Sequence, residues 1–272
     1  MHSIVLTVHN KDWLVEEVLK GIVRNTTGDY ELIVVLDGCT DNSEQVVHSY
    51  LGSKKINHQI LYAPNVFETK ANNLGLKKSN GEKVIIVQDD MVITEPAWNK
   101  RMQKPFDEFD DVFAVTAQTA HNWIFNPNSV HLGMKEDLDN CWCDIVEHVD
   151  HAAKIHGLDR DTFAIRCSVN RGPLMIDHGD LKKLNYLDEV FAPQDMDDHD
   201  LMYRMHKELG KVCGCYWIDY ESKDEWGGTR ISGSPASWLL KANHKNMKLF
   251  YDRHKDLIHL EYQKENRRLS DG

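Results

Sequence analysis

The stretch VIIVQDDMVI, residues 84–93, combines an apolar run with two adjacent carboxylates. Its first four residues are all β-branched, which favours a strand in the interior of a sheet. The run then changes directly to Gln88, Asp89 and Asp90. Carboxylates are costly to remove from water. Their position at the end of a buried strand therefore indicates a chemical role at that point of the fold.

The chain before this stretch alternates between short apolar runs and segments with a helical spacing of apolar residues. We predict strands at residues 3–8, 32–36, 59–62 and 83–87. The first helix is predicted to begin after Asp12 as its N-cap. The second is predicted to open with a capping box of Asp41 and Glu44, and the third to cover residues 72–78. Strands that alternate with helices predict an α/β fold with a mostly parallel sheet flanked by helices.

Three acidic side chains follow predicted strands of this sheet. Asp37 follows the second strand and Asp89 and Asp90 the fourth, while Thr7 to Asn10 lie at the end of the first. Because the carboxyl ends of parallel strands meet at one edge, these side chains are expected to converge there. Carboxylates that converge repel one another, so a positive group is expected between them. A single Asp after a strand is typical of a turn, but three at successive strand ends favour a ligand site.

The second half of the chain has a weaker pattern. Helices are predicted at residues 98–109, 181–184 and 198–209, and strands at residues 112–117 and 173–176. The polar segment 121–161 is predicted to consist of loops and short helices that cover a site. Residues 235–267, rich in Lys and His, are predicted to be helical and to pack as a C-terminal cover.

Composition and charge exclude several classes of protein. A chain of 272 residues that is 41% hydrophobic can bury a large core, and a net charge of −11 argues against sequence-independent binding of nucleic acid. No apolar run approaches the ~20 residues that cross a bilayer, so we expect no transmembrane segment. The six cysteines include no Cys-x-x-Cys pair, which favours a reducing, cytoplasmic location. Two Cys-x-Cys pairs are typical of small buried thiols, with a shared zinc site as the alternative.

Four motifs occur in a characteristic order. They are LTVHN (residues 6–10), VVLDGCTDNS (34–43), ANNLGLKKSNGEKVIIVQDDM (71–91) and DMDDHDLMYR (195–204). In this order they resemble the inverting nucleotide-sugar glycosyltransferases of family 2, which have the GT-A fold. The resemblance covers roughly residues 3–205. It implies a donor-binding half at residues 1–117, an acceptor-binding half with the catalytic base at 118–233, and a C-terminal helical segment at 234–272.

The resemblance implies a nucleoside diphosphate sugar, with a UDP-sugar favoured, and a bound Mn²⁺ or Mg²⁺ that neutralises the leaving diphosphate. Gln88, Asp89 and Asp90 match the family's metal-binding carboxylate motif, although Gln88 replaces its usual first Asp. By this comparison Asp90 is the metal ligand, and Asp89 contacts the ribose or the sugar of the donor.

The resemblance also implies further donor-binding residues. These are Asp37 for the base or ribose, Thr7 and Asn10 for the base, and Asn73 near the sugar and diphosphate. The family often has an Arg just before that Asn. This chain has Asn72 there, so Lys70 is expected to supply the charge.

The motif DMDDHDLMYR matches the family's catalytic base region. Its matching positions are Asp197, Asp198, Asp200, Leu201 and Arg204. The resemblance implies that Asp198 takes the proton of the acceptor hydroxyl, with Asp197 as the next candidate. The alternative is that these acids only stabilise a helix N-terminus.

The acceptor is expected to be a hydroxyl of a glycan, lipid or protein. A nucleotidyltransferase is one alternative, but such enzymes have a Gly-rich, basic loop after the first strand, which this chain lacks. A non-catalytic nucleotide- or sugar-binding module is another, and Gln88 supports it. The sequence WGGTR at residues 226–230 is typical either of a mobile loop that closes over the diphosphate or of a plain turn.

Overall fold

The computed structural model describes residues 1–123, 142–147, 158–227, 237–258 and 263–270. Its first part alternates strands and helices as predicted. In order the elements are β1 (His2–Val8), α1 (Val15–Asn25), β2 (Tyr30–Asp37), α2 (Ser43–Gly52), β3 (Asn57–Ala63), α3 (Phe67–Lys78), β4 (Lys83–Gln88), β5 (Val92–Ile93), α4 (Trp98–Glu108) and β6 (Val112–Thr116). The apolar, β-branched runs thus form the strands, and the segments with helical spacing form the helices.

The later part is richer in short strands. Its described elements are β7 (Thr119–Trp123), β8 (Trp142–Glu147), β9 (Thr162–Arg166), β10 (Ser168–Val169), β11 (Leu174–Asp177), α7 (His178–Lys183), the 3₁₀ helix η1 (Glu189–Phe191), α8 (Asp197–Leu209), β12 (Val212–Cys215), β13 (Tyr220–Glu221), the 3₁₀ helix η2 (Asp224–Trp226), α9 (Ser237–Ile258) and β14 (Glu265–Arg268). The predicted helices at 98–109 and 198–209 and the strand at 112–117 are confirmed within two residues at each end.

Within the described residues, one nine-stranded sheet has the order β14-β9-β12-β6-β11-β4-β1-β2-β3. The strands β1 to β4 are mutually parallel, and β6 is parallel to β12. The strands β9 and β11 run against their neighbours. All the others therefore point in one direction, which confirms the prediction of a mostly parallel sheet.

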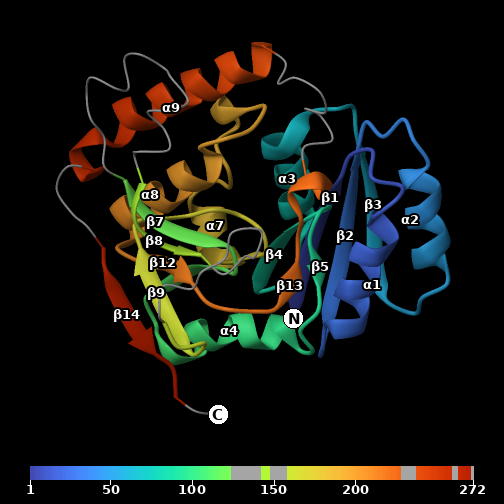
Figure 1. Cartoon of the computed structure of the whole chain (residues 1–272), viewed down its shortest axis with the longest axis horizontal. Coiled ribbons are helices and arrows are strands. Elements are labelled where there is room, and N and C mark those ends of the chain that lie inside the picture. The colour runs from blue at the N-terminus through green and yellow to red at the C-terminus, as the bar shows by residue number, and fades with distance from the viewer. Residues whose placement is uncertain (124–141, 148–157, 228–236, 259–262, 271–272) are drawn as a thin grey trace.

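Helices cover both faces of the sheet (Figure 1). On one face, apolar residues of α1, α2 and α4 pack with Ile4 and Leu6 of β1. On the other, residues of α3, α7 and α8 pack around Val5, whose side chain points the opposite way. Gly75 brings α3 close to the sheet, because a Cβ atom there would lie 2.4 Å from Cγ1 of Val5. The helix α9 lies over α8 as an outer cover (Figure 1).

The predicted starts of the first two helices are wrong. The helix α1 begins at Val15 without a side-chain cap, and Asp12 instead accepts a hydrogen bond from the backbone N–H of Asn42 at 3.3 Å. Asp41 does bind the backbone N–H of Ser43, at 3.0 Å, but Glu44 accepts from the hydroxyl of Tyr62 instead of closing a capping box. Asp12 and Glu44 thus bind partners from other segments, which local patterns do not reveal.

Two further expectations need correction. The segment 121–161 is not made only of loops and short helices, because β7 and β8 form part of a three-stranded sheet with β10; residues 124–141 and 148–157 lie outside the described part. The segment 235–267 is not helical to its end. Residues Glu265–Arg268 form β14, which pairs antiparallel with β9 at the edge of the main sheet. An edge strand pairs with a neighbour on one side only, through its backbone groups. The polar side chains of β14 therefore do not prevent its pairing with β9.

Candidate functional site

The carboxyl ends of the central strands meet at one edge, as predicted. Thr7 of β1 lies beside Val35 of β2 and Gln88 of β4 in the sheet register. Asp37 is the last residue of β2, and Asp89 and Asp90 directly follow β4. This edge, which we call the strand-end site, thus brings together Thr7, Asp37, Asp89 and Asp90.

The positive group expected between these carboxylates is supplied in part by the chain itself. Lys11 is 1% exposed, and its Nζ lies 3.5 Å from Oδ1 of Asp89. The backbone N–H of His9 donates to Oδ2 of Asp89 at 2.9 Å. Burial raises the pKa of Asp89 to about 6, although Lys11 and the His9 N–H oppose this shift. Lys11 also donates to the carbonyl oxygen of Trp226, so it ties the WGGTR segment to the site; residues 228–230 lie outside the described part.

Asp90 is the second carboxylate at this edge. It is half-buried. Burial, followed by the charges of Cys215 and Asp90, raises the pKa of Tyr220 well above its ordinary value. In the described part of the chain, no three His, Cys, Asp or Glu side chains are grouped to hold a metal ion. Carboxylate oxygens nevertheless suit Mg²⁺ and Mn²⁺, and Mg²⁺ is commonly bound through one or two carboxylates plus substrate phosphates. The donor set therefore fits a metal that is completed by a bound diphosphate.

Two of the described cysteines fit the interpretation as buried thiols. Cys213 and Cys215 are buried on β12, and burial raises the pKa of both thiols well above the ordinary value. Cys141 lies outside the described residues.

The loops beside the strand-end site are held by their own polar side chains. Oδ1 of Asn10 accepts the backbone N–H of Thr40 at 2.7 Å, so the loop after β1 is fixed to the loop after β2. Thr7 is half-buried, and Lys70 is exposed on α3. The donor-binding roles of Thr7, Asn10 and Lys70 stay predictions.

Asn73 joins α3 to the segment before η1. Its Nδ2 donates to the carbonyl oxygen of Leu187 at 2.9 Å, and its Oδ1 accepts the backbone N–H of Leu187 at 3.1 Å. Nδ2 also donates to Glu189 of η1. The side chain is 2% exposed, so a buried amide makes this connection. A contact between Asn73 and the donor stays a prediction.

Asp37 supports the start of α3. Its two carboxylate oxygens accept the backbone N–H groups of Val66 and Phe67, at 2.7 and 2.8 Å, and the residue is 1% exposed. We expect Asp37→Ala to lower the free energy of unfolding by about 1–3 kcal/mol, because two largely buried N–H groups lose their partner. Urea denaturation measures this effect, with the exposed Asp110→Ala as the control.

The same variant tests the donor role of Asp37. If Asp37 also contacts the nucleotide, UDP affinity without metal should fall in the folded variant, whereas a purely structural residue would leave that affinity unchanged. A variant as stable as the wild type would contradict the structural role.

The base region begins α8 and surrounds a buried guanidinium. Arg171 is 6% exposed; it forms an ion pair with Asp197, and its Nε lies 3.5 Å from Oδ2 of Asp198. Its backbone N–H donates to the same oxygen at 3.1 Å. Burial alone would raise the pKa of Asp198, but the charges of His199 and Arg171 hold it well below the usual range. Asp197 is fully buried, whereas Asp198 is 7% exposed, so only Asp198 of this pair reaches solvent.

Residues 170–172 connect the base region to the strand-end site. The backbone N–H of Arg171 binds Asp198, and the next residue, Gly172, lies against Gln88 and Met91. Gly172 has φ +106°, and a Cβ atom there would lie 2.6 Å from Oε1 of Gln88. The two motifs that the sequence analysis placed in different halves are therefore separated by one short loop.

We expect Gly172→Ala to lower the free energy of unfolding by about 1–3 kcal/mol, because it combines an unfavourable backbone conformation with a clash. Urea denaturation measures the change. Gly52→Ala is the matched control, since nothing lies within 4 Å of a Cβ atom at that position. Equal stability of the two variants would show that the loop adapts to the extra atom.

Sequence reasoning assigned no role to Lys11 or Arg171, and it left His199 open between a surface residue and a ligand. The structure buries all three. The available signals were local ones: Lys11 directly follows the motif LTVHN, and His199 lies inside DMDDHDLMYR. Arg171 lies outside the four motifs, and its partners are a buried pair of acids in another segment.

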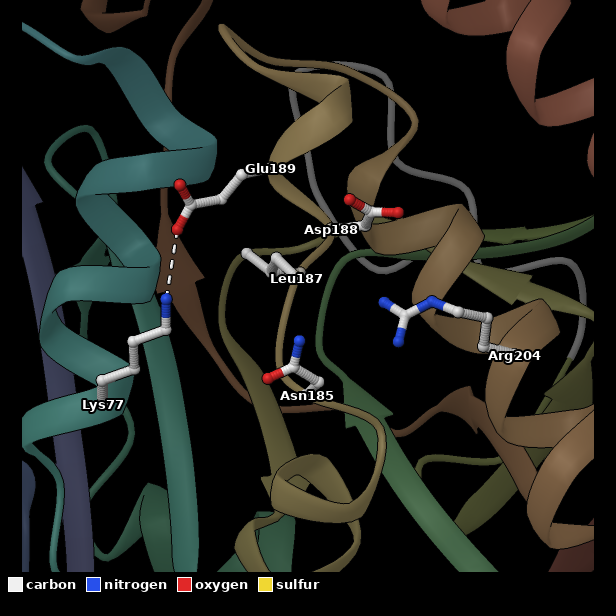
Figure 2. Close-up of a pocket in the computed structure, with 6 residues that line it drawn as sticks. All are labelled: Lys77, Asn185, Leu187, Asp188, Glu189 and Arg204. Atoms are coloured by element: carbon white, nitrogen blue, oxygen red, sulfur yellow. Dashed lines mark hydrogen bonds and ion pairs between the residues drawn. The ribbon is translucent and has the colours of Figure 1, made fainter.

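A separate pocket of about 430 Å³ lies beside the C-terminal part of α3 (Figure 2). It is lined by Lys77, Asn185, Leu187, Asp188, Glu189 and Arg204. Lys77 forms an ion pair with Glu189 at 3.1 Å, and Asp188 pairs with Arg253 at 2.8 Å. The charged residues of this pocket are already paired. The pocket also lies at the end of α3 opposite to the one that Asp37 binds, so we do not assign it to the donor.

The chain matches the family model for glycosyl transferase family 2 over residues 3–170. Among curated proteins it is 24% identical over 98 residues to an uncharacterized glycosyltransferase, EpsJ, of Bacillus subtilis. It is 28% identical over 94 residues to the glycosyltransferase GlyG of Streptococcus pneumoniae. These matches cover 36% and 34% of this chain but only 28% and 31% of the relatives, so the chain aligns with less than a third of each.

Two solved structures share the fold. S. aureus TarS, in complex with UDP-GlcNAc, aligns with a TM-score of 0.65 and 16% identity over 94% of this chain and 70% of that chain. Glucosyl-3-phosphoglycerate synthase from Mycobacterium tuberculosis, in complex with Mn²⁺, UDP and phosphoglyceric acid, aligns with a TM-score of 0.55 and 14% identity over 99% and 87%. No described helix is both long and apolar enough to cross a membrane. The family match covers more than half of the chain, and this protein therefore belongs to glycosyltransferase family 2 and has the GT-A fold.

Proposed function

We propose that this protein transfers a sugar from a nucleoside diphosphate sugar, by preference a UDP-sugar, to a hydroxyl of a glycan, lipid or protein, with inversion at the anomeric carbon. The observation that carries the proposal is the loop 170–172, which contacts the base region on one side and the strand-end site on the other. A donor at the strand-end site would thus have Asp198 within the same site.

The donor side of the proposal rests on the polar groups at the strand ends. Thr7, Asn10 and Asp37 would face the nucleoside, and Asp89 the ribose or sugar. Asp90 would hold Mn²⁺ or Mg²⁺, and the ion would supply positive charge to the diphosphate as it leaves. Lys11 neutralises Asp89 and so reduces the repulsion between that carboxylate and an anionic donor.

The acceptor side rests on Asp198. In an inverting transfer the acceptor oxygen forms a bond to the anomeric carbon while the bond from that carbon to the diphosphate oxygen breaks. The acceptor's proton passes to a carboxylate on the side opposite the leaving group. Asp198 is charged and reaches solvent, whereas Asp197 is fully buried against Arg171. Asp198 therefore suits this step better.

The solved neighbours support the donor class. TarS was solved with UDP-GlcNAc, and the M. tuberculosis synthase with Mn²⁺ and UDP. Their identity to this chain is 16% and 14%, which leaves the sugar and the acceptor open. One observation favours a second candidate: Gln88 replaces a carboxylate of the family motif, as a non-catalytic sugar-binding module would tolerate.

A two-step experiment separates these functions. Thermal unfolding is first followed with a set of nucleotide sugars, with and without Mn²⁺, because a ligand that binds only the folded state raises its apparent stability. The best donor is then tested for slow hydrolysis. Stabilisation together with release of the sugar supports the transferase. Stabilisation without release supports the binding module, and no stabilisation by any nucleotide sugar would overturn both.

A further inference from the structure

Two buried imidazole rings lie behind Asp198. Nδ1 of His199 is 3.1 Å from Oδ1 of Asp198, and Nε2 of the same ring is 3.1 Å from Nε2 of His121. His199 is 4% exposed and His121 is fully buried. A continuous line of contacts thus runs from the proposed base through His199 to His121 on β7.

The hydrogen-bond partners of His121 fix its proton. Nδ1 of His121 lies 3.3 Å from the carbonyl oxygen of Asn122, which can only accept, so Nδ1 carries the proton. Burial, and after it the charge of His199, lower the pKa of His121 well below its ordinary value, so the ring is neutral. Its ring also stacks on Trp142, with centroids 4.1 Å apart. We therefore assign Nε2 of His121 as the acceptor towards His199, in a cluster that the side chain of Asn170 also joins.

This acceptor determines the state of His199. Nε2 of His199 faces Nε2 of His121 and also Oδ1 of Asn170, both at 3.1 Å, so it must donate. Nδ1 of His199 then faces a carboxylate oxygen of Asp198. The contact is not aligned as an ideal hydrogen bond. Without a proton between them, however, the lone pairs of Nδ1 and of Oδ1 would repel at 3.1 Å, so we place one proton in this contact. Arg171 binds the other carboxylate oxygen and favours the proton on the ring.

We propose that His199 is a positioning residue for the base, sharing one proton with Asp198 and holding its Oδ1, while His121 and Asn170 hold the imidazole in place. The inference rests on the proposed function, because it assigns a role to the base of that reaction. The described groups that face this pair are Asp195 before α8, Arg171 from the loop after β10, and His121 from β7. The rings of Trp123, Trp142 and Phe250 contribute no charge.

The proposal predicts a change in pH dependence. A positive ring beside Asp198 lowers the pH at which that carboxylate takes up a proton and stops acting as a base. The variant His199→Asn keeps a donor near the position of Nδ1 but removes the charge. We expect the acid limb of kcat/KM to move upward by about 1–3 pH units, the usual effect of one close opposite charge on a carboxylate. UDP affinity should stay within a factor of about three, since the described hydrogen bonds and ion pairs of His199 are with Asp198, His121 and Asn170.

The control is His206→Asn on the same helix, whose ring contacts Gln263 and not the base. A uniform loss of rate without a shift of the acid limb would overturn the proposal and leave His199 a packing residue. The expected result also requires that the acid limb of kcat/KM in His206→Asn stays at the same pH as in the wild type.

A second measurement does not depend on turnover. In ¹⁵N-labelled protein, the proton on Nδ1 of His199 should be lost at lower pH in Asp198→Asn than in the wild type, because the variant lacks the carboxylate that faces this nitrogen. Loss of that proton at the same pH in both proteins would overturn the inference. Because these spectra need no substrate, failure of the proposed transfer reaction would be seen separately, as absent turnover with the proton pattern intact.

Discussion

Replacing Asp198 by Asn is expected to lower sugar transfer by about 10²–10⁴-fold, the usual contribution of a general base. The amide keeps the size of the side chain and can still accept from the backbone N–H of Arg171, so α8 should remain in place. The proposed donor site lies on the other side of the loop 170–172, so UDP affinity should survive. Turnover and calorimetry on the same preparation measure both quantities.

The structure limits which residue would replace Asp198 if the variant stayed active. Asp197 is fully buried against Arg171, and Asp200 binds Arg204, Arg253 and His254. Asp195 is half-buried, and burial raises its pKa to about 6, which suits a base near neutral pH. Full activity of Asp198→Asn would therefore transfer the role to Asp195.

The stereochemistry of the product tests the same step. Direct displacement by an activated hydroxyl gives a β-linked product from an α-linked donor, and NMR of the product reads the linkage. Retained configuration would contradict a single displacement.

Asp90→Ala is expected to abolish metal-dependent binding of UDP without unfolding the protein. A carboxylate at a strand end contributes little to the core, and its proposed partner is the cation. Calorimetry with UDP, with and without Mn²⁺, measures the effect, and Asp110→Ala is again the exposed control. The metal-free affinity should be equal in wild type and variant.

Unchanged binding with Mn²⁺ would remove Asp90 from the metal site. Asp89→Asn would then be the next variant to measure. Because Asp89 is already paired with Lys11, we expect its replacement to disturb the contact between Lys11 and Trp226 more than the metal.

Patterns within one segment predicted most of the fold, and contacts between segments account for the errors. The run VIIV and its neighbours are apolar because they lie between two layers of helices, so their spacing alone indicates the element. The direction of β11 was not predictable in this way, because a buried apolar run has the same sequence pattern in a parallel and in an antiparallel strand. The strand β14 was missed because its polar residues pair through the backbone at an edge.

In the candidate site, too, patterns within a segment were predictable and contacts between segments were not. Its strand-end residues were predictable because strand ends share one edge. The partner of Asp89 was not, since Lys11 lies far away in the sequence and binds it only once β1 and β4 are adjacent. Arg171 and His121 were missed for the same reason: their acidic and imidazole partners come from α8.

The bridge made by Asn73 has a consequence for motion. Its amide binds both the N–H and the C=O of Leu187, as a neighbouring strand would, and the junction is buried. Separating α3 from the segment that carries Leu187 would break both hydrogen bonds together, because one side-chain amide makes them. We therefore expect substrates to enter and products to leave through rearrangement of surface segments. A hinge motion between α3 and the segment that carries Leu187 is not expected.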